Sequence, residues 1–256
     1  MPKINKDSTL NITFVGIGLC LLCSAIISFI AIQLRSVQEN NVVLDMQKKI
    51  VSSAGLDEVY GSVENAMSNI KTLIIDLDRG EIVDINPDTY ELSKELREDG
   101  KYKFLSAEED VASIKKREKY SKVYIEYKDN EINTLILPVR GYGLWGILYG
   151  YLAIEGDFNT VAGLEFYEHK ETPGLGAEID NPKWKALWKG KKIYKDKKVN
   201  LAVIKGKVEA GDSESSYKID GLSGATITSR GVTNMVAYWF GESGYSSLLR
   251  ELNYES

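Results

Sequence analysis

The chain has 256 residues, of which 43% are hydrophobic and 27% are charged, and it contains 22 Gly and 5 Pro. This composition excludes a disordered, collagen-like or small disulfide-stapled protein, and the length allows one large or two small domains. The formal net charge is -5, and no basic stripe with interleaved aromatic residues offsets the acidic balance. We therefore expect no nucleic acid among the partners.

The N-terminal segment has the composition of a membrane-spanning helix. No charged side chain occurs from Ser8 to Leu34, and residues 12–32 are almost wholly apolar, which matches the ~20 residues that a helix needs to cross the hydrocarbon core. The apolar region of a cleaved signal peptide is shorter, about 7–15 residues. We therefore expect residues 1–35 to form an N-terminal tail and an uncleaved transmembrane helix. Lysines flank the span on both sides, so charge leaves its orientation open.

Both cysteines of the chain, Cys20 and Cys23, lie inside this span. Their spacing is that of a redox pair or half of a zinc site, but no His, Asp or Glu accompanies them to complete a metal shell. We interpret them as small apolar residues in lipid and expect no metal site. Residues 36–256 contain no cysteine, so no disulfide can form there and either redox compartment is open to them.

The rest of the chain predicts a helical stalk in residues 36–56 and an α+β domain in residues 57–256. Apolar residues recur at near-helical spacing after the span until Gly55. A strand-turn-strand follows in residues 72–77 and 82–85, and then two charged helices are expected in residues 88–97 and 106–119. Four strands joined by short turns come next, in residues 123–127, 132–139, 147–154 and 161–169.

Short turns between these strands indicate an antiparallel meander, and strands clustered apart from helices favour an α+β fold, with a largely antiparallel sheet flanked by helices. Beyond the meander we expect a helix beginning near Pro182, a strand in residues 199–204 and a short helix around residues 246–252. Between the last two, Val232, Met235, Val236, Trp239 and Phe240 mark an amphipathic helix.

Residues 141–146, Gly-Tyr-Gly-Leu-Trp-Gly, match the G-x-G-x-x-G pattern of a dinucleotide site. Such a site also needs a helix to follow, whereas residues 147–154 have the composition of a strand, so we reject that interpretation. Tyr142 and Trp145 present aromatic faces beside glycines that let a flat ring approach. An aromatic-rich hairpin packed on the core explains the same residues equally well.

His169 is the only histidine of the chain. No nucleophile motif accompanies it, so we interpret it as an ordinary, partly exposed histidine and predict no catalytic residue of the chain's own.

Residues 220–229 concentrate hydroxyl side chains and glycines where a polar loop meets the amphipathic helix. Unpaired amides at a helix start favour an anion such as phosphate. A plain N-cap by Ser223, Thr226 or Thr228 would need the same residue types, and composition leaves both interpretations open.

Residues 220–226 also resemble a motif of a known protein family. Asp220-Gly-Leu-Ser-Gly-Ala-Thr226 resembles the D-x-x-(S/T)-G-A-T motif of proteins that carry FMN on a threonine. With the single N-terminal anchor and Glu171-Thr-Pro-Gly-Leu-Gly176 upstream, nearly the whole chain is similar to the C subunit of the Na+-translocating NADH:quinone oxidoreductase.

The resemblance implies that FMN is bound covalently, its phosphate joined to the hydroxyl of Thr226, with Thr228 as the fallback acceptor. Ser223, Gly224 and Ala225 would leave the acceptor accessible, and Arg230 would add positive charge. Glu171, Thr172 and Leu175 resemble the family's loop beside the flavin ring, and Tyr142 and Trp145 are second choices for ring contacts.

The resemblance also implies partners and a location. A separate flavin transferase would move FMN from FAD onto the threonine with Mg2+, and the other subunits of the membrane respiratory complex would supply hydride chemistry and the sodium path. The chain would lie in the bacterial inner membrane, with its N-terminus in the cytoplasm and the FMN domain in the periplasm.

The implied function is that of an electron carrier that relays electrons from NADH toward quinone, coupled to Na+ export. One alternative is the related FMN-carrying subunit of the ferredoxin:NAD electron-transport complex, although residues 57–120 fit the quinone-reductase subunit better. An alternative from another class is a membrane-anchored ligand-sensing module, which would lack an output domain here.

Overall fold

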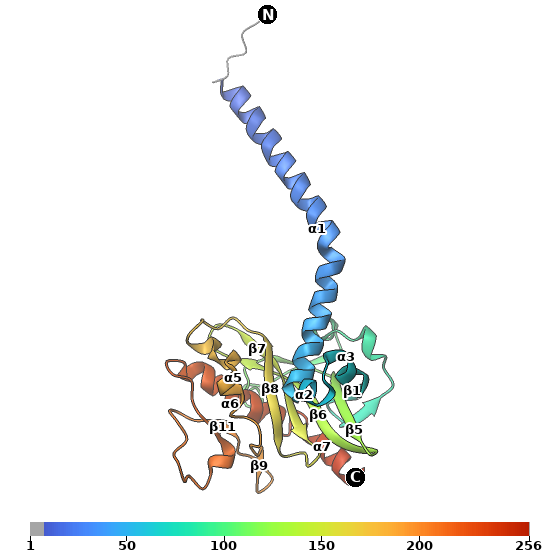
Figure 1. The fold of residues 1–256 in the computed structure, drawn as a ribbon, viewed down its shortest axis with the longest axis vertical. Helices are drawn as coiled ribbons and strands as arrows, with labels where there is room; N and C mark the ends of the chain where they lie inside the picture. Colours follow the sequence, from blue (N-terminus) through green and yellow to red (C-terminus); the bar gives the residue numbers. More distant parts are fainter. Residues whose placement is uncertain (1–7, 256) are drawn as a thin grey trace, which may run out of the picture. The chain divides into compact units, whose positions relative to one another are not determined.

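The structure is a computed structural model that describes residues 8–255, and the chain divides into two compact units between Met46 and Gln47 (Figure 1). Helix α1 (Thr9–Ser53) runs without interruption through the expected span and stalk. Among the described residues it is the one helix long and apolar enough to cross a membrane. It ends two residues before Gly55, whose φ of +65° is the left-handed conformation that glycine adopts without strain. The domain boundaries expected at residues 35 and 56 stay a prediction.

A six-stranded antiparallel sheet in the order β2-β1-β5-β6-β7-β8 forms the centre of the second unit (Figure 1). The expected hairpin is present as β1 (Ile70–Asp76) and β2 (Glu81–Val83). The expected meander is present as β5 (Tyr120–Lys128), β6 (Glu131–Tyr142), β7 (Ile147–Glu155) and β8 (Val161–Glu168). Short turns between β-rich segments make each strand pair with its neighbour in sequence.

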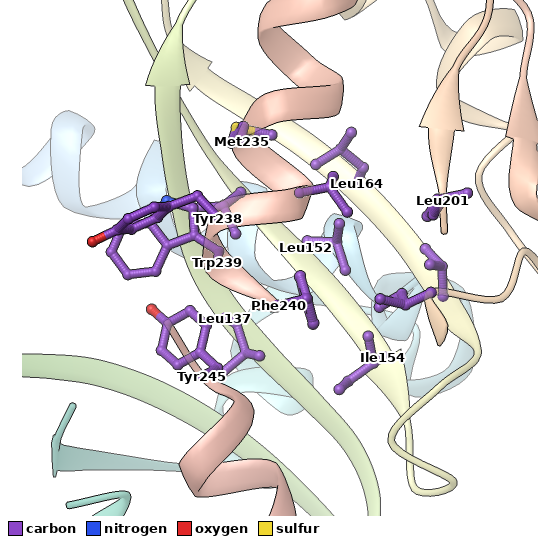
Figure 2. Packing of buried hydrophobic residues seen from close by; sticks show 14 of the residues in the cluster. Leu137, Leu152, Ile154, Leu164, Leu201, Met235, Tyr238, Trp239, Phe240 and Tyr245 are labelled. Atoms are coloured by element: carbon purple, nitrogen blue, oxygen red, sulfur yellow. The ribbon is translucent and has the colours of Figure 1, made fainter. Parts of the chain in front are cut away.

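Side chains alternate between the two faces of the sheet along each strand. Both faces are covered by helices. One face carries Leu135, Leu137 and Leu152, which belong to the hydrophobic core together with Val232 and Met235 of α6 (Thr226–Trp239) (Figure 2). Helix α7 (Ser246–Glu255) adds Leu248, Leu249 and Leu252 to this core.

The second face carries the paired row Tyr124, Ile136, Ala153 and Gly163. The end of α1 covers it: a Cβ on Gly163 would lie 2.5 Å from the carbonyl oxygen of Ser53. Helices α2 (Leu56–Tyr60) and α3 (Val63–Ser68) follow, and the Tyr60 hydroxyl donates to Glu126 Oε1 at 2.7 Å. The sheet therefore lies between two helical layers of the same unit.

The C-terminal end of α6 is locked to β6 by aromatic side chains (Figure 2). Trp239 is fully buried and donates from Nε1 to the carbonyl oxygen of Arg140 at 2.7 Å. Tyr245 stacks on Trp239 with ring centroids 5.2 Å apart and donates to the carbonyl oxygen of Pro138 at 2.7 Å. These contacts fix the position of the whole helix on the sheet, including its N-terminal end.

The prediction of two charged helices before β5 is wrong. The first is reduced to η1 (Pro87–Thr89) and α4 (Leu92–Glu95), and the second is replaced by a hairpin of β3 (Tyr102–Phe104) and β4 (Lys116–Glu118).

The capping box of the expected second helix does form, because Glu109 N donates to Ser106 Oγ at 3.3 Å and Ser106 N to Glu109 Oε2 at 3.0 Å. Asp110 then accepts the backbone N–H groups of Ile114 and Lys115 at 2.7 and 2.8 Å. These side-chain bonds replace helical ones and turn the chain.

The segment after the meander is irregular. It contains η2 (Gly176–Asp180), α5 (Pro182–Lys185), β9 (Tyr194–Lys195), β10 (Lys198–Val199) and η3 (Ser215–Tyr217). Helix α5 begins at Pro182 as expected. The strand expected in residues 199–204 is broken by Asn200 and Leu201, whose N–H groups both donate to Ile193 O, and only β11 (Ala202–Val203) follows. Strand β11 pairs in parallel with β12 (Lys218–Ile219), directly before the loop that leads into α6.

Candidate functional site

Helix α6 begins at Thr226 without a side-chain cap. Its N-cap residue is Ala225, which has no hydroxyl, and no side chain caps the helix at this position. Ser229 Oγ instead accepts the N–H of Leu222 at 3.1 Å, which fastens the preceding loop to the helix. The plain N-cap interpretation therefore does not hold, and the first-turn amides that a side-chain cap would satisfy are left to bind an anion.

The two candidate acceptor threonines are in different environments. Thr226 is exposed on the first turn of α6, whereas Thr228 is fully buried. The Thr228 hydroxyl donates to Glu171 Oε2 at 2.5 Å. Thr226 is thus the hydroxyl that another molecule can reach.

A pocket of about 460 Å³ opens beside Thr226. Ser223 and Gly224 line it from the loop, and the basic residues Arg230 and Lys205 also line it. Gly224 has a φ of +73°, and a Cβ there would lie 2.9 Å from Leu175 Cδ2. The pocket is therefore lined by an exposed threonine, a helix N-terminus and two basic residues, which together suit a phosphate group.

Glu171 connects the segments around this helix start. The residue is 5% exposed, and Oε1 accepts the N–H groups of Leu144 and Trp145 at 2.9 and 3.0 Å. Both oxygens of the Glu171 carboxylate thus bond within the protein, and the expected place of Glu171 beside a flavin ring stays a prediction.

The glycines of the G-x-G-x-x-G pattern have packing roles in this arrangement. A Cβ on Gly143 would lie 2.6 Å from Glu171 Oε1, and one on Gly141 would lie 2.7 Å from the Met235 Cβ of α6. A Cβ on Gly146 would lie 3.3 Å from Lys170 Cδ. Strand β7 follows, not a helix, and the amides after Gly143 bind a carboxylate of the protein itself.

Exposed apolar side chains gather on the segments that Glu171 joins. Tyr142 is 46% exposed, Trp145 62% and Leu175 45%, and Thr172 is also exposed. Leu144 and Ile227 are exposed in the same segments, and sequence reasoning missed both, as it missed Lys205. Burial of large apolar side chains away from water is favourable in free energy, so this surface suits a flat aromatic ligand.

His169 has a structural role at the start of the loop. Its Nδ1 accepts the N–H of Glu171 at 3.1 Å, and its Nε2 lies 2.7 Å from Asp180 Oδ2. These bonds agree with the expected ordinary histidine. Among residues 8–255, no group of three or more His, Cys, Asp or Glu could hold a metal ion, and Cys20 and Cys23 are free.

Comparison with known proteins agrees with this geometry. A family model described as the FMN-binding domain matches residues 143–241, which include the Glu171 loop, the pocket and α6. The fold and the site thus define a protein with one long apolar N-terminal helix followed by an FMN-binding domain of mostly antiparallel sheet.

The C subunit of the Na+-translocating NADH-quinone reductase of Pseudomonas aeruginosa is 45% identical over 255 residues, which cover 97% of each chain. The corresponding protein of Vibrio anguillarum is 40% identical over 249 residues, covering 97% of this chain and 96% of that one. The crystal structure of Shewanella oneidensis NqrC superposes with a TM-score of 0.74 at 32% identity, covering 82% of this chain and 96% of that one. The chain belongs to the NqrC family, the C subunits of the Na+-translocating NADH-quinone reductase.

Proposed function

We propose that this chain is the electron-transfer subunit that carries covalent FMN in the Na+-translocating NADH:quinone (ubiquinone) reductase. In this role it relays electrons from NADH toward quinone, coupled to Na+ export. The observation that carries the proposal is the exposed hydroxyl of Thr226 at the uncapped start of α6, inside the Ser223-Gly-Ala-Thr226 segment. FMN would be joined to that hydroxyl through its phosphate.

The residues around Thr226 fit such a phosphate. The first-turn amides of α6 can donate to its oxygens, and Arg230 and Lys205 line the same pocket with positive charge. Gly224 and Ala225 place no large side chain between the hydroxyl and an approaching flavin transferase. The burial of Thr228 and its bond to Glu171 favour Thr226 over the fallback acceptor.

The exposed apolar side chains fit the rest of the cofactor. Bound FMN supplies the reversible uptake and release of electrons. Tyr142, Trp145 and Leu175 would cover the ring and exclude water from one of its faces, and the Thr172 side chain could hydrogen-bond at its edge. A ring held at this surface keeps an edge open to redox partners.

The family of the chain supports the proposed partners and location. None of the described side chains takes hydride from NADH, and the described residues contain one helix that could cross a membrane, which by itself cannot enclose a sodium path. We therefore assign these steps to the other polypeptides of the complex. A flavin transferase would attach the FMN. We place α1 in the bacterial inner membrane, with the N-terminus in the cytoplasm and the FMN domain in the periplasm.

The test is in-gel flavin fluorescence after denaturing electrophoresis, for the full chain co-expressed with a flavin transferase. We expect a fluorescent wild-type band, loss of fluorescence with Thr226→Val and retention with Thr228→Ser, which keeps the hydroxyl that Glu171 needs. Fluorescence in Thr226→Val would move the attachment to another residue. A dark wild-type band would contradict the covalent flavin altogether.

A further inference from the structure

Glu171 is a buried carboxylate whose partners are uncharged. Oε1 accepts two backbone N–H groups, from Leu144 and Trp145, and Oε2 accepts the Thr228 hydroxyl. An ionised carboxylate only accepts hydrogen bonds, so three converging donors match it. Among the described residues, these three uncharged donors, and not a basic side chain, bind the carboxylate.

The residues around this carboxylate pack closely against it. A Cβ on Gly143 would lie 2.6 Å from Oε1, and a Cβ on Gly176 would lie 2.4 Å from Oε2 and 2.7 Å from Thr228 Oγ1. Two glycines from separate segments thus leave the space that the carboxylate and its partner hydroxyl occupy. A site closed on both sides in this way holds one geometry.

The same carboxylate joins three segments that have a candidate role in flavin binding. Leu144 and Trp145 belong to the turn between β6 and β7, and Thr228 lies two residues after Thr226 on α6. Thr172 and Leu175 follow Glu171 directly in the chain. Glu171 therefore ties together the turn, its own loop and the helix that carries the attachment residue.

We propose that Glu171 is a positioning residue that holds these three segments in one arrangement, and that its negative charge lowers the reduction potential of the FMN on Thr226. The inference rests on the proposed function. Reduction adds negative charge to a flavin, and a buried negative charge without a cation beside it opposes that addition more strongly than an exposed one.

The first measurement is the midpoint potential of the bound flavin, by spectroelectrochemical titration of the full chain co-expressed with a flavin transferase. Glu171→Gln removes the charge and keeps the shape: the amide oxygen still accepts two N–H groups, and the amide NH2 can donate to Thr228. The matched control is Glu168→Gln, at an exposed carboxylate three residues earlier on β8. We expect an upward shift in Glu171→Gln, equal to a severalfold more favourable reduction, and none in Glu168→Gln.

The second measurement needs no flavin. In a Thr226→Val background, hydrogen exchange is followed by mass spectrometry on a peptide that contains residues 143–146. We expect Glu171→Ala to speed exchange at Leu144 and Trp145 by at least tenfold and Glu171→Gln to restore protection. Thr228→Val, which removes one donor and keeps the carboxylate, should leave these two amides protected.

Each arm has its own contradictory result. A wild-type potential in Glu171→Gln overturns the charge effect, and unchanged exchange in Glu171→Ala overturns the positioning role. A wild-type chain without covalent flavin contradicts the proposed function and the charge effect together, while the exchange measurement still decides the positioning role.

Discussion

Asp157, in the turn between β7 and β8, shows how one side chain can shape a loop. Its carboxylate accepts the N–H groups of Thr160 and Asn159 at 2.6 and 2.9 Å, and Lys192 Nζ lies 3.0 Å away. Burial alone would raise the pKa of Asp157, but the hydrogen bonds from Thr160, Asn159 and Lys192 outweigh it and lower the pKa to about 2. The charged form is therefore the one that the folded turn prefers.

This preference predicts a stability that depends on acid. The pKa of Asp157 is lower in the folded chain than its usual 3.8, so its contribution is present above about pH 4 and is lost as pH falls through about 2. We expect Asp157→Asn to lower the thermal midpoint at pH 6 and to behave like the wild type near pH 2. Thermal unfolding at the two pH values measures this. An equal difference at both would show that the charge of Asp157 contributes nothing.

At the scale of the element, α6 depends on a close approach to β6. Gly231 is buried in the middle of the helix, and a Cβ there would lie 2.3 Å from the carbonyl oxygen of Tyr142. Glycine in a helix interior costs about 1 kcal/mol relative to alanine, so propensity alone would favour a larger residue. The absence of a side chain is what lets the helix lie against the strand that leads to Tyr142.

Gly231→Ala should therefore destabilise the chain in spite of its better helix propensity. Forcing a methyl group against backbone costs about 1–3 kcal/mol, which for a domain of this size lowers the thermal midpoint by roughly 2–12 °C. Asn234→Ala, one turn further along at a half-buried position, is the matched control and should not be destabilised by such a clash. A Gly231→Ala chain as stable as the wild type would mean that α6 and β6 move apart without cost.

At the scale of the whole molecule, the proposed orientation can be tested because residues 36–256 contain no cysteine. Glu209→Cys places one thiol at an exposed loop position. We expect a membrane-impermeant maleimide to label this variant in intact spheroplasts and to leave the wild type unlabelled, since Cys20 and Cys23 lie in the apolar span. Labelling of Glu209→Cys only after the membrane is disrupted would place the domain in the cytoplasm.

Local patterns predicted much of the fold. The uncharged stretch from Ser8 to Leu34 indicated one long apolar helix, and β-rich segments with short turns predicted the meander of β5 to β8. The period of Val232, Met235, Val236 and Trp239 predicted α6. These features could be predicted because each depends on residues close together in the chain.

The hairpin of β3 and β4 could not be predicted in the same way. The capping box at Ser106 and Glu109 is a real helix-start signal, and it forms. The helix that should follow is replaced because Asp110 binds the N–H groups of Ile114 and Lys115 and because β4 pairs with β3. Tertiary pairing here prevails over a weak local preference.

Neighbouring positions alone predicted the long apolar N-terminal helix, the strand pattern and the Ser-Gly-Ala-Thr segment, because hydropathy, turn residues and a short motif are local properties of the sequence. Long-range packing determines that Thr226 is exposed while Thr228 is buried, and that Gly143 leaves space for a carboxylate. The partners of Glu171 lie 26, 27 and 57 residues away in the chain. Contacts at such separations exist only after the sheet and α6 have packed, because packing alone brings those segments together.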